Sequence, residues 1–195
     1  MFYPNFSPFP ELATRRFVLR EINVADASLI HELRSDQETN ALIDRENSKS
    51  IEDALLFIDR IKRGVSRNEC IYWVICFQNL SDLIGTIGYY NFNLSAERAE
   101  IGYELLTKFR GQGIMNEVLP RIIQFGFEEM KLKWITAFTT EQNIGSVRLL
   151  EKSGFQLSAS EDNNTLEHVS GMLTFILHNR QYQKVENQMS NDERK

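Results

Sequence analysis

The sequence is poor in cysteine and proline, and it has no long apolar run. Its 195 residues include two cysteines, four prolines and ten glycines, so disulfide-rich scaffolds and collagen-like chains are excluded. No apolar stretch approaches the ~20 residues that a membrane-spanning helix needs. The first ten residues, MFYPNFSPFP, lack the basic and apolar segments of a signal peptide. We therefore expect a globular protein with no membrane partner.

An excess of positive charge is also missing. The chain carries 22 basic and 27 acidic residues, a formal net charge of −5 and a pI of about 5.3. A dedicated nucleic-acid-binding protein normally presents a basic face, so we expect no nucleic-acid partner. The charge is unevenly spread, because residues 108–152 hold seven basic and five acidic side chains while residues 1–107 hold 11 and 16. This distribution favours a small phosphate-bearing ligand.

Both cysteines lie in one apolar run, CIYWVIC, which predicts a strand. Cys70 and Cys76 are then roughly 20 Å apart along that strand, well beyond disulfide distance. Two thiols that cannot pair predict a reducing compartment, the cytoplasm.

Apolar periodicity predicts a single mixed α/β domain over residues 1–180, with an extended arm at 1–13 and a polar, flexible tail at 181–195. Ser50 is expected to begin a helix that stops at Gly64, and Pro120 to kink the helix that contains it. The expected strands are 15–22, 70–78, 83–92, 98–106, 133–139, 155–159 and 169–177; the expected helices begin at Asp26, Ser50, about Gly111 and Asn143. This order indicates a sheet of about seven strands with helices on both faces.

The segment Lys108–Met115, KFRGQGIM, follows a strand and opens a helix. Gly111 and Gly113 allow a tight turn with unobstructed N–H groups, and the helix N-terminus adds positive potential. This combination holds a phosphate or pyrophosphate, with Lys108 and Arg110 as charge partners. The alternative is that two glycines merely start a helix.

A second segment, NIGSVRLLEKSGF, opens the next helix. Asn143 and Ser146 stand three residues apart, so both side chains can project from one face of the first turn. Arg148 and Lys152 form a basic pair four residues apart. The alternative is that Asn143 is only a helix cap and the basic pair only a solvated face.

Together these segments resemble the GNAT superfamily of N-acetyltransferases, in particular its RimJ/RimL-type branch. The resemblance runs from about Thr14 to Leu177 and is carried by TRRFVLREI, by LIGTIGYYNF leading to AEIGYEL, and by the two segments above. The pyrophosphate signature of the family is Arg/Gln-x-x-Gly-x-Gly/Ala. Lys108 is a conservative departure at its first position, while Gly111 and Gly113 match. The resemblance implies the GNAT fold, acetyl-CoA as co-substrate and no metal.

The resemblance also implies a set of cofactor-binding residues. The pyrophosphate is expected on the N–H groups of the glycine loop, the pantetheine beside the end of the preceding strand, and its sulfur near the start of the second helix. Lys152, or else Arg148, is expected to reach the ribose phosphate. The residues expected to bind the cofactor are Leu105, Leu106, Lys108, Arg110, Gly111, Gln112, Gly113, Ile114, Met115, Asn143, Ser146 and Lys152.

Acetyl transfer to an amine needs a base for the ammonium proton, a donor for the thioester oxygen and a partner for the departing sulfur. By its place in the family motif, Ser146 is the candidate partner of the sulfur; the alternative is that it only lines the first helical turn. Glu104 and Glu100 share a strand face and are the candidate bases, with Glu161 a weaker one; the alternative is an exposed or ion-paired carboxylate. Three histidines have no candidate catalytic or metal-binding partner at a suitable spacing and are interpreted as structural or surface residues: His31, His168 and His178.

The leading functional hypothesis is acetyl transfer from acetyl-CoA to a primary amine, with a ribosomal-protein-like N-terminus as one acceptor. Two alternatives remain. One is a small amine, either a polyamine or an antibiotic, as acceptor, and the other is a non-catalytic acyl-CoA-binding module. A P-loop protein is excluded, because no Gly-Lys-Ser/Thr follows the glycines. The branch often forms homodimers, so a homodimer is a further expectation.

Overall fold

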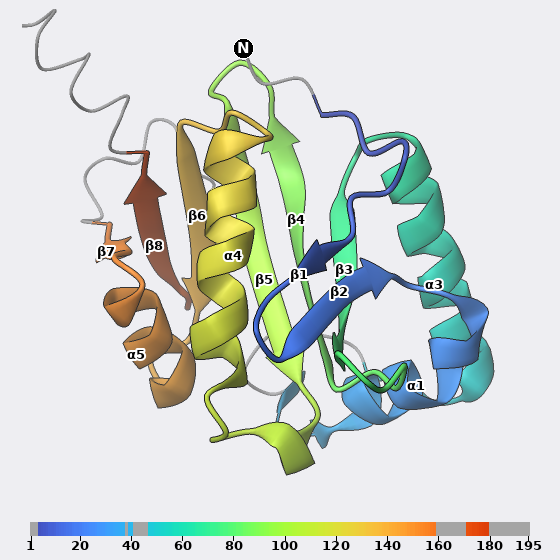
Figure 1. Ribbon diagram of the computed structural model, residues 1–195. Helices are drawn as coiled ribbons and strands as arrows, with labels where there is room; N and C mark the ends of the chain where they lie inside the picture. The colour runs from blue at the N-terminus through green and yellow to red at the C-terminus, as the bar shows by residue number, and fades with distance from the viewer. Residues whose placement is uncertain (1–3, 38, 41–46, 159–170, 180–195) are drawn as a thin grey trace, which may run out of the picture.

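The computed structural model describes residues 4–37, 39–40, 47–158 and 171–179. Within them, eight strands form one sheet in the order β1-β2-β3-β4-β5-β6-β8-β7 (Figure 1). The mixed α/β class is confirmed, and the eighth strand arises because the sheet adds the two-residue strand β1 at one edge. The expected tail, Glu161 and His168 lie outside the described residues.

The strands and helices follow the apolar periodicity closely. The strands are β1 (Leu12–Ala13), β2 (Phe17–Glu21), β3 (Ile71–Phe77), β4 (Gly85–Asn93), β5 (Arg98–Leu105), β6 (Trp134–Thr139), β7 (Gln156–Leu157) and β8 (Leu173–His178). The α-helices are α1 (Ala27–Ser35), α3 (Ile51–Ser66), α4 (Ile114–Glu128) and α5 (Ile144–Lys152), and short 3₁₀ turns cover Val24–Asp26 and Thr107–Phe109.

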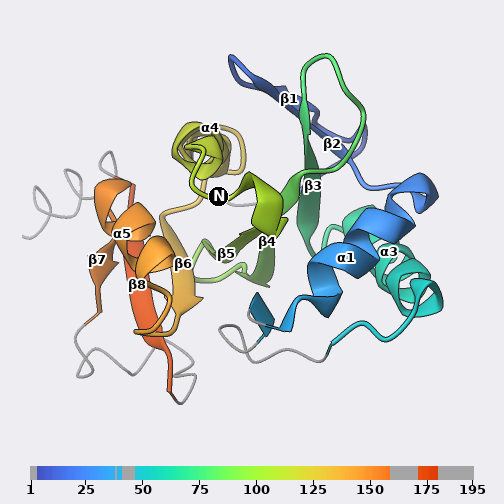
Figure 2. The same cartoon turned by 90° about the horizontal axis from the view of Figure 1, so that it is seen from below.

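Helices cover both faces of the sheet, as expected. Figure 2 shows α4 on one side and α1 with α3 on the other. The alternation of β3 explains this, because neighbouring residues point to opposite faces. Trp73 meets Phe125 of α4 edge-on, with ring centroids 5.2 Å apart. Tyr72 meets Phe57 of α3 in the same manner at 5.7 Å. Two apolar layers therefore sandwich the central strands.

The sheet opens between β5 and β6. Strands β3 to β5 form an antiparallel meander, and β2 pairs antiparallel with β3. β5 and β6 are parallel, and their pairing covers only Arg98–Glu100 against Trp134–Thr136. Both strands continue beyond this point, β5 to Leu105 and β6 to Thr139. The ends of the two strands are therefore unpaired with each other, which leaves a gap inside the sheet.

The second helix extends past the residue expected to end it. The hydroxyl of Ser50 accepts from the N–H of Asp53, at 3.3 Å, and caps α3 as predicted. The stop at Gly64 is wrong, because α3 continues to Ser66. A Cβ at Gly64 would lie 2.7 Å from the sulfur of Cys70. Gly64 thus permits close packing of the helix on β3, and the left-handed residue after the helix is Asn68, with φ 58°.

Two other expectations concern Pro120 and the cysteines. α4 is continuous through Pro120, which sits on its exposed side. The kink itself remains a prediction. Cys70 and Cys76 are both free thiols, which confirms that they form no disulfide. No helix among the described residues has the length and apolarity needed to cross a membrane.

Candidate active site

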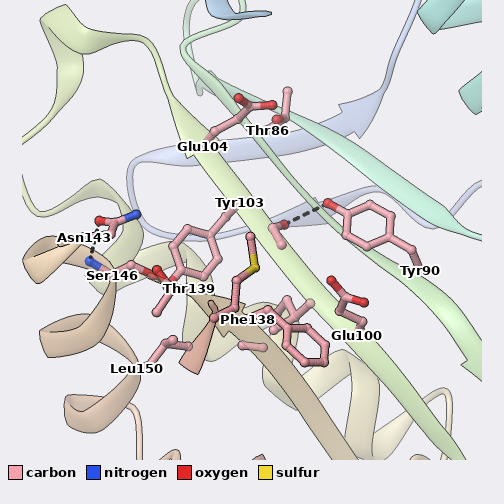
Figure 3. Close-up of a pocket in the computed structure, with 14 residues that line it drawn as sticks. Thr86, Tyr90, Glu100, Tyr103, Glu104, Phe138, Thr139, Asn143, Ser146 and Leu150 are labelled. Atoms are coloured by element: carbon pink, nitrogen blue, oxygen red, sulfur yellow. Dashed lines mark hydrogen bonds between the residues drawn. The ribbon is translucent and has the colours of Figure 1, made fainter. Parts of the chain in front are cut away.

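A cavity of about 230 Å³ occupies the gap between β5 and β6. Its lining comes from β4, β5, β6 and the first turns of α5, and includes Gly102, Tyr103, Phe138 and Ser146 (Figure 3). The gap arises because the two strands part after Glu100 and Thr136. The site is therefore formed by the interruption of the sheet.

The backbone of β5 turns alternate residues toward this gap. The N–H of Leu106 donates to the carbonyl of Ile84 at 3.1 Å, and the register continues without a shift through Gly102. Even-numbered residues of β5 therefore bond to β4, and the peptide groups of Ile101, Tyr103 and Leu105 face the other side. Beyond Glu100, no strand pairs with that side. The peptide groups of Ile101 and Tyr103 can bond to an added extended ligand, as the resemblance implies for pantetheine, whereas the carbonyl of Leu105 accepts from Arg110 at 3.4 Å.

Two hydroxyls meet on the α4 side of the gap. The phenol of Tyr103 and the hydroxyl of Ser146 are 3.0 Å apart (Figure 3). Burial raises the pKa of Tyr103 to about 12, although the bond to Ser146 acts in the opposite direction. Asn143 caps α5 by accepting from the N–H of Ser146 at 3.1 Å. The capping role of Asn143 is thus present, and it fixes the turn that carries Ser146.

Thr139 is a cavity residue that the sequence analysis does not single out. It ends β6 and is 3% exposed, and its hydroxyl has no hydrogen-bond partner among the described residues. Figure 3 places it beside Tyr103 and Ser146. A buried hydroxyl normally has a partner, so this oxygen suits a polar ligand atom. A threonine that ends a strand near a helix cap is too common a pattern to have revealed it.

The opposite side of the cavity is acidic. Glu100, Gly102 and Glu104 share one face of β5, and Thr86 lies opposite Glu104 in the register (Figure 3). The carboxylate of Glu100 accepts from the side-chain amide of Asn91 at 2.7 Å. The structure therefore brings both predicted carboxylates to the same cavity as Ser146.

Tyr90 also lines this acidic side. Its phenol donates to the carbonyl of Gly102 at 3.2 Å, and its ring lies where a Cβ of Gly102 would be, 2.9 Å away. Burial raises the pKa of Tyr90 well above its ordinary value, and nearby acidic groups add to the effect. Tyr90 is therefore protonated at neutral pH, and the candidate bases are the carboxylates.

The glycine loop has the conformation that phosphate binding needs. Gly111 and Gly113 have φ of 73° and 70°, and no side chain caps α4. A Cβ at Gly111 would meet nothing within 4 Å, and one at Gly113 only Arg16, at 3.9 Å. The loop N–H groups thus remain accessible at a helix N-terminus, where an anion is stabilised. Ile114 and Met115 begin the helix and are buried beneath the loop.

Arg16 holds the loop from the side of β2. Its guanidinium donates to the carbonyls of Gln112 and Gly113 at 3.4 and 3.2 Å, and to Glu117 at 2.6 Å. Burial opposes the charge of Glu117, but bonds from Arg16 and Thr14 outweigh it and lower its pKa to about 2. This ion pair ties α4 and the loop to the start of the sheet, and the sequence gives no spacing signal for it.

Lys108 and Arg110 point toward α1. Lys108 pairs with Glu32 at 3.1 Å, an exposed contact with side chains 54% and 49% accessible. Arg110 bonds to Thr39 and to the carbonyl of Leu105, and lies 3.8 Å from Asp36. These two side chains are thus held by the α1 segment beside the loop, at the side where Leu106 packs.

The remaining candidates lie away from the gap. Lys152 is exposed in the last turn of α5, at the opposite end from Ser146, and Arg148 is exposed midway along it. His31 bonds to Ser48 at 2.9 Å, and the ring of His178 lies 5.3 Å from that of Trp134. Both contacts favour structural roles. Among the described residues, no three His, Cys, Asp or Glu side chains gather as metal ligands would.

The residues present fit an acyl-CoA. The loop offers N–H groups to a pyrophosphate, the free side of β5 offers peptide groups to pantetheine, and the hydroxyl of Thr139 has no partner in the described chain. The last two features lie at the cavity, which Tyr103 and Thr139 line, and the loop follows the end of β5. The contact of Lys152 or Arg148 with the ribose phosphate stays a prediction.

Comparison with known proteins gives consistent matches. The sequence model of the acetyltransferase (GNAT) domain matches residues 16–156. An uncharacterized N-acetyltransferase of Bacillus subtilis (strain 168), YoaA, is 36% identical over 148 residues, which cover 76% of this chain and 84% of that protein. A putative ribosomal-protein-serine acetyltransferase from Vibrio cholerae superposes with a TM-score of 0.71 at 21% identity, covering 88% and 99% of the two chains. Mycobacterium smegmatis RimJ, solved with CoA-disulfide, gives 0.72 at 17% identity, covering 88% of each chain.

Proposed function

Because this chain belongs to the acetyltransferase (GNAT) family, we propose that it transfers the acetyl group of acetyl-CoA to the N-terminal amine of a protein. Its family makes it an acetyl-CoA-dependent N-acetyltransferase. The acceptor and the roles of the site residues are our proposal. The observation that carries it is that one cavity has hydroxyls on one side of the sheet and carboxylates on the other.

The two sides of the cavity suit two substrates. Acetyl-CoA supplies a thioester whose carbonyl carbon is open to attack by an amine. We assign its sulfur to the side of Ser146 and Thr139, and its pyrophosphate to the N–H groups of the glycine loop. The amine then approaches from the side of Glu100 and Glu104.

The acidic side performs two tasks for the amine. An amine in neutral water is mostly an ammonium ion, and carboxylates attract it. One carboxylate must then accept a proton before the nitrogen can attack. We assign this step to Glu104, which is nearer the end of β5, and the attraction to Glu100, whose oxygen is already bonded to Asn91.

A protein N-terminus is the proposed acceptor for two reasons. The Vibrio cholerae relative in fold is described as a putative ribosomal-protein-serine acetyltransferase, which favours a protein amine. The cavity is also lined by Tyr90 and Thr86, on the face of the sheet that carries α1 and α3. We assign the entry of an extended peptide end to this side.

The test is an acceptor panel at fixed acetyl-CoA. N-terminal peptides, polyamines and aminoglycosides are compared by release of free thiol and by mass spectrometry of the acetylated product. We expect turnover on peptides, and about 100-fold loss of kcat in Glu104→Gln with a smaller loss in Glu100→Gln, since a general base contributes about 10²–10⁴-fold. Turnover restricted to the small amines would contradict the proposed acceptor. Tight binding of acetyl-CoA without turnover of any amine would instead indicate a non-catalytic module.

A further inference from the structure

The hydrogen bond between Tyr103 and Ser146 joins two hydroxyls, and either oxygen could be the donor. The two oxygens are 3.0 Å apart, and neither has another hydrogen-bond partner among the described residues. A buried phenol O–H needs an acceptor, and the Ser146 oxygen is the one within reach. We assign the phenol as the donor and the serine oxygen as the acceptor.

This direction leaves the proton of Ser146 available. A serine hydroxyl has one proton and two lone pairs, and Tyr103 occupies one lone pair. If the bond ran the other way, Ser146 would spend its only proton on Tyr103 and could offer nothing to a ligand. The backbone N–H of Ser146 already donates to Asn143, so the hydroxyl is the donor that Ser146 can offer to a ligand.

We propose that Tyr103 is a positioning residue that holds the Ser146 hydroxyl with its proton directed at the departing sulfur. This rests on the proposed function, in which the sulfur lies on that side of the cavity. The amine nitrogen bonds to the acetyl carbon, the carbon–sulfur bond breaks, and its electron pair goes to sulfur. The proton of the amine goes to a carboxylate, and the sulfur gains a proton from water when the free thiol is released.

Relative acidities indicate that the two hydroxyls orient and do not protonate the sulfur. Burial raises the pKa of Tyr103 to about 12, whereas an ordinary thiol has a pKa of about 8.5. Transfer of the phenol proton to the thiolate is therefore unfavourable by roughly 3.5 pKa units. Tyr103 is therefore protonated at neutral pH. The serine hydrogen bond then stabilises charge on sulfur as it develops.

A double-mutant cycle tests this assignment. Ser146→Ala is expected to lower kcat by about tenfold or more, and Tyr103→Phe by about fivefold, the loss typical of one hydrogen bond. If Tyr103 acts through Ser146, the double variant loses no more than Ser146→Ala alone. KM for acetyl-CoA is expected to stay within about twofold throughout, since ground-state binding is not involved. Independent losses that multiply in the double variant, or a change in KM alone, would overturn the proposal.

Tyr89→Phe is the matched control. Its phenol is also buried and donates to the carbonyl of Ile122 at 3.0 Å, on the α4 side outside the cavity. Its removal is expected to lower the melting temperature without changing kcat. An equal loss of kcat in Tyr89→Phe and Tyr103→Phe would show that the effect is structural, and would also overturn the proposal.

A second measurement needs no turnover and so separates this inference from the proposed function. In Ser146→Cys, a donating phenol stabilises the thiolate, so the pKa of the introduced thiol, from the pH dependence of iodoacetamide alkylation, is expected to rise by about half to one unit when Tyr103→Phe is added. The native thiols react slowly because burial raises the pKa of Cys70 to about 11 and that of Cys76 above its ordinary value. Equal pKa values in the two variants would contradict the donor role, whatever the amine panel shows.

Discussion

The carboxylate of Glu117, in the first turn of α4, accepts three hydrogen bonds from the segment that begins β2. The guanidinium and the N–H of Arg16 contribute bonds of 2.6 and 2.8 Å, and Thr14 contributes a third, also of 2.8 Å. Arg16 also donates to the loop carbonyls of Gln112 and Gly113. The carboxylate of Glu117 therefore fixes the side chain that holds the glycine loop.

The Glu117→Gln variant is expected to be less stable than the wild type at pH 7. Its free energy of unfolding is also expected to fall less when the pH is lowered. The folded pKa of Glu117 is about 2 against an ordinary 4.5. A lowered pKa stabilises the fold fully above about pH 4.5, and this contribution disappears as pH falls from 4.5 toward 2. We expect a loss of about 1–2 kcal/mol at pH 7, since the pair is partly exposed. Urea unfolding at pH 7 and pH 3 measures it: the variant and the wild type should differ less at the lower pH.

The conformation of the glycine loop predicts an effect on donor binding. Gly111→Ala forces a side chain into φ 73°, at a cost of about 1–2 kcal/mol although no atom lies in the way. The strain should distort the loop and raise KM for acetyl-CoA about threefold to tenfold. Gly171→Ala is the control, because it carries φ 82°, an equally open Cβ position and no place in the loop. Both variants should lose similar stability in thermal melts, and equal KM values for the two would contradict a role of the loop.

The contacts of Lys108 predict a gain of donor affinity. Its exposed pair with Glu32 is worth about 0.2–1 kcal/mol, and a pyrophosphate must compete with it. Glu32→Gln releases the lysine and should lower the Kd of acetyl-CoA by up to about threefold, measured by calorimetry. Asp59→Asn removes the comparable pair of Asp59 with Arg63 on α3 and should leave Kd unchanged. A weaker affinity in Glu32→Gln would mean that the pair supports the site.

A structural feature can be predicted from the sequence when it depends on residues that are close together in the chain. The meander, the cap at Ser50, the turn of Gly111 and the alternation of Glu100 and Glu104 follow from periods of a few residues, and the structure has them. The prediction that the helix ends at Gly64 is wrong because the sequence does not distinguish a glycine that ends a helix from one that allows another side chain to pack closely. The relevant neighbour, Cys70, is identified only by tertiary packing. Local patterns therefore predict conformation better than they predict packing.

Local sequence patterns also do not predict the directions in which long side chains point. Arg110 lies within the signature motif, yet it bonds to Thr39, 71 residues away, and Glu117 meets Arg16 at a separation of 101. The hydroxyl partner of Ser146 is Tyr103, 43 residues earlier on β5. A motif predicts which residues gather near a ligand, whereas the contacts that orient them depend on the register of distant strands.

The unpaired hydroxyl of Thr139 allows a prediction in which stability and activity change in opposite directions. Its side chain is buried and its oxygen has no partner in the described chain, so Thr139→Val removes a desolvation penalty of about 1 kcal/mol. The melting temperature should rise by about 2–4 °C. If the hydroxyl serves the acyl donor, KM for acetyl-CoA should rise severalfold at the same time. Thr136→Val, on the same strand, removes a buried hydroxyl that does have a partner, the carbonyl of Ala99 at 3.4 Å, and should lower the melting temperature. A stabilised Thr139→Val enzyme with unchanged KM would show that this oxygen contacts neither substrate, because a ligand bond lost from a buried site always weakens binding.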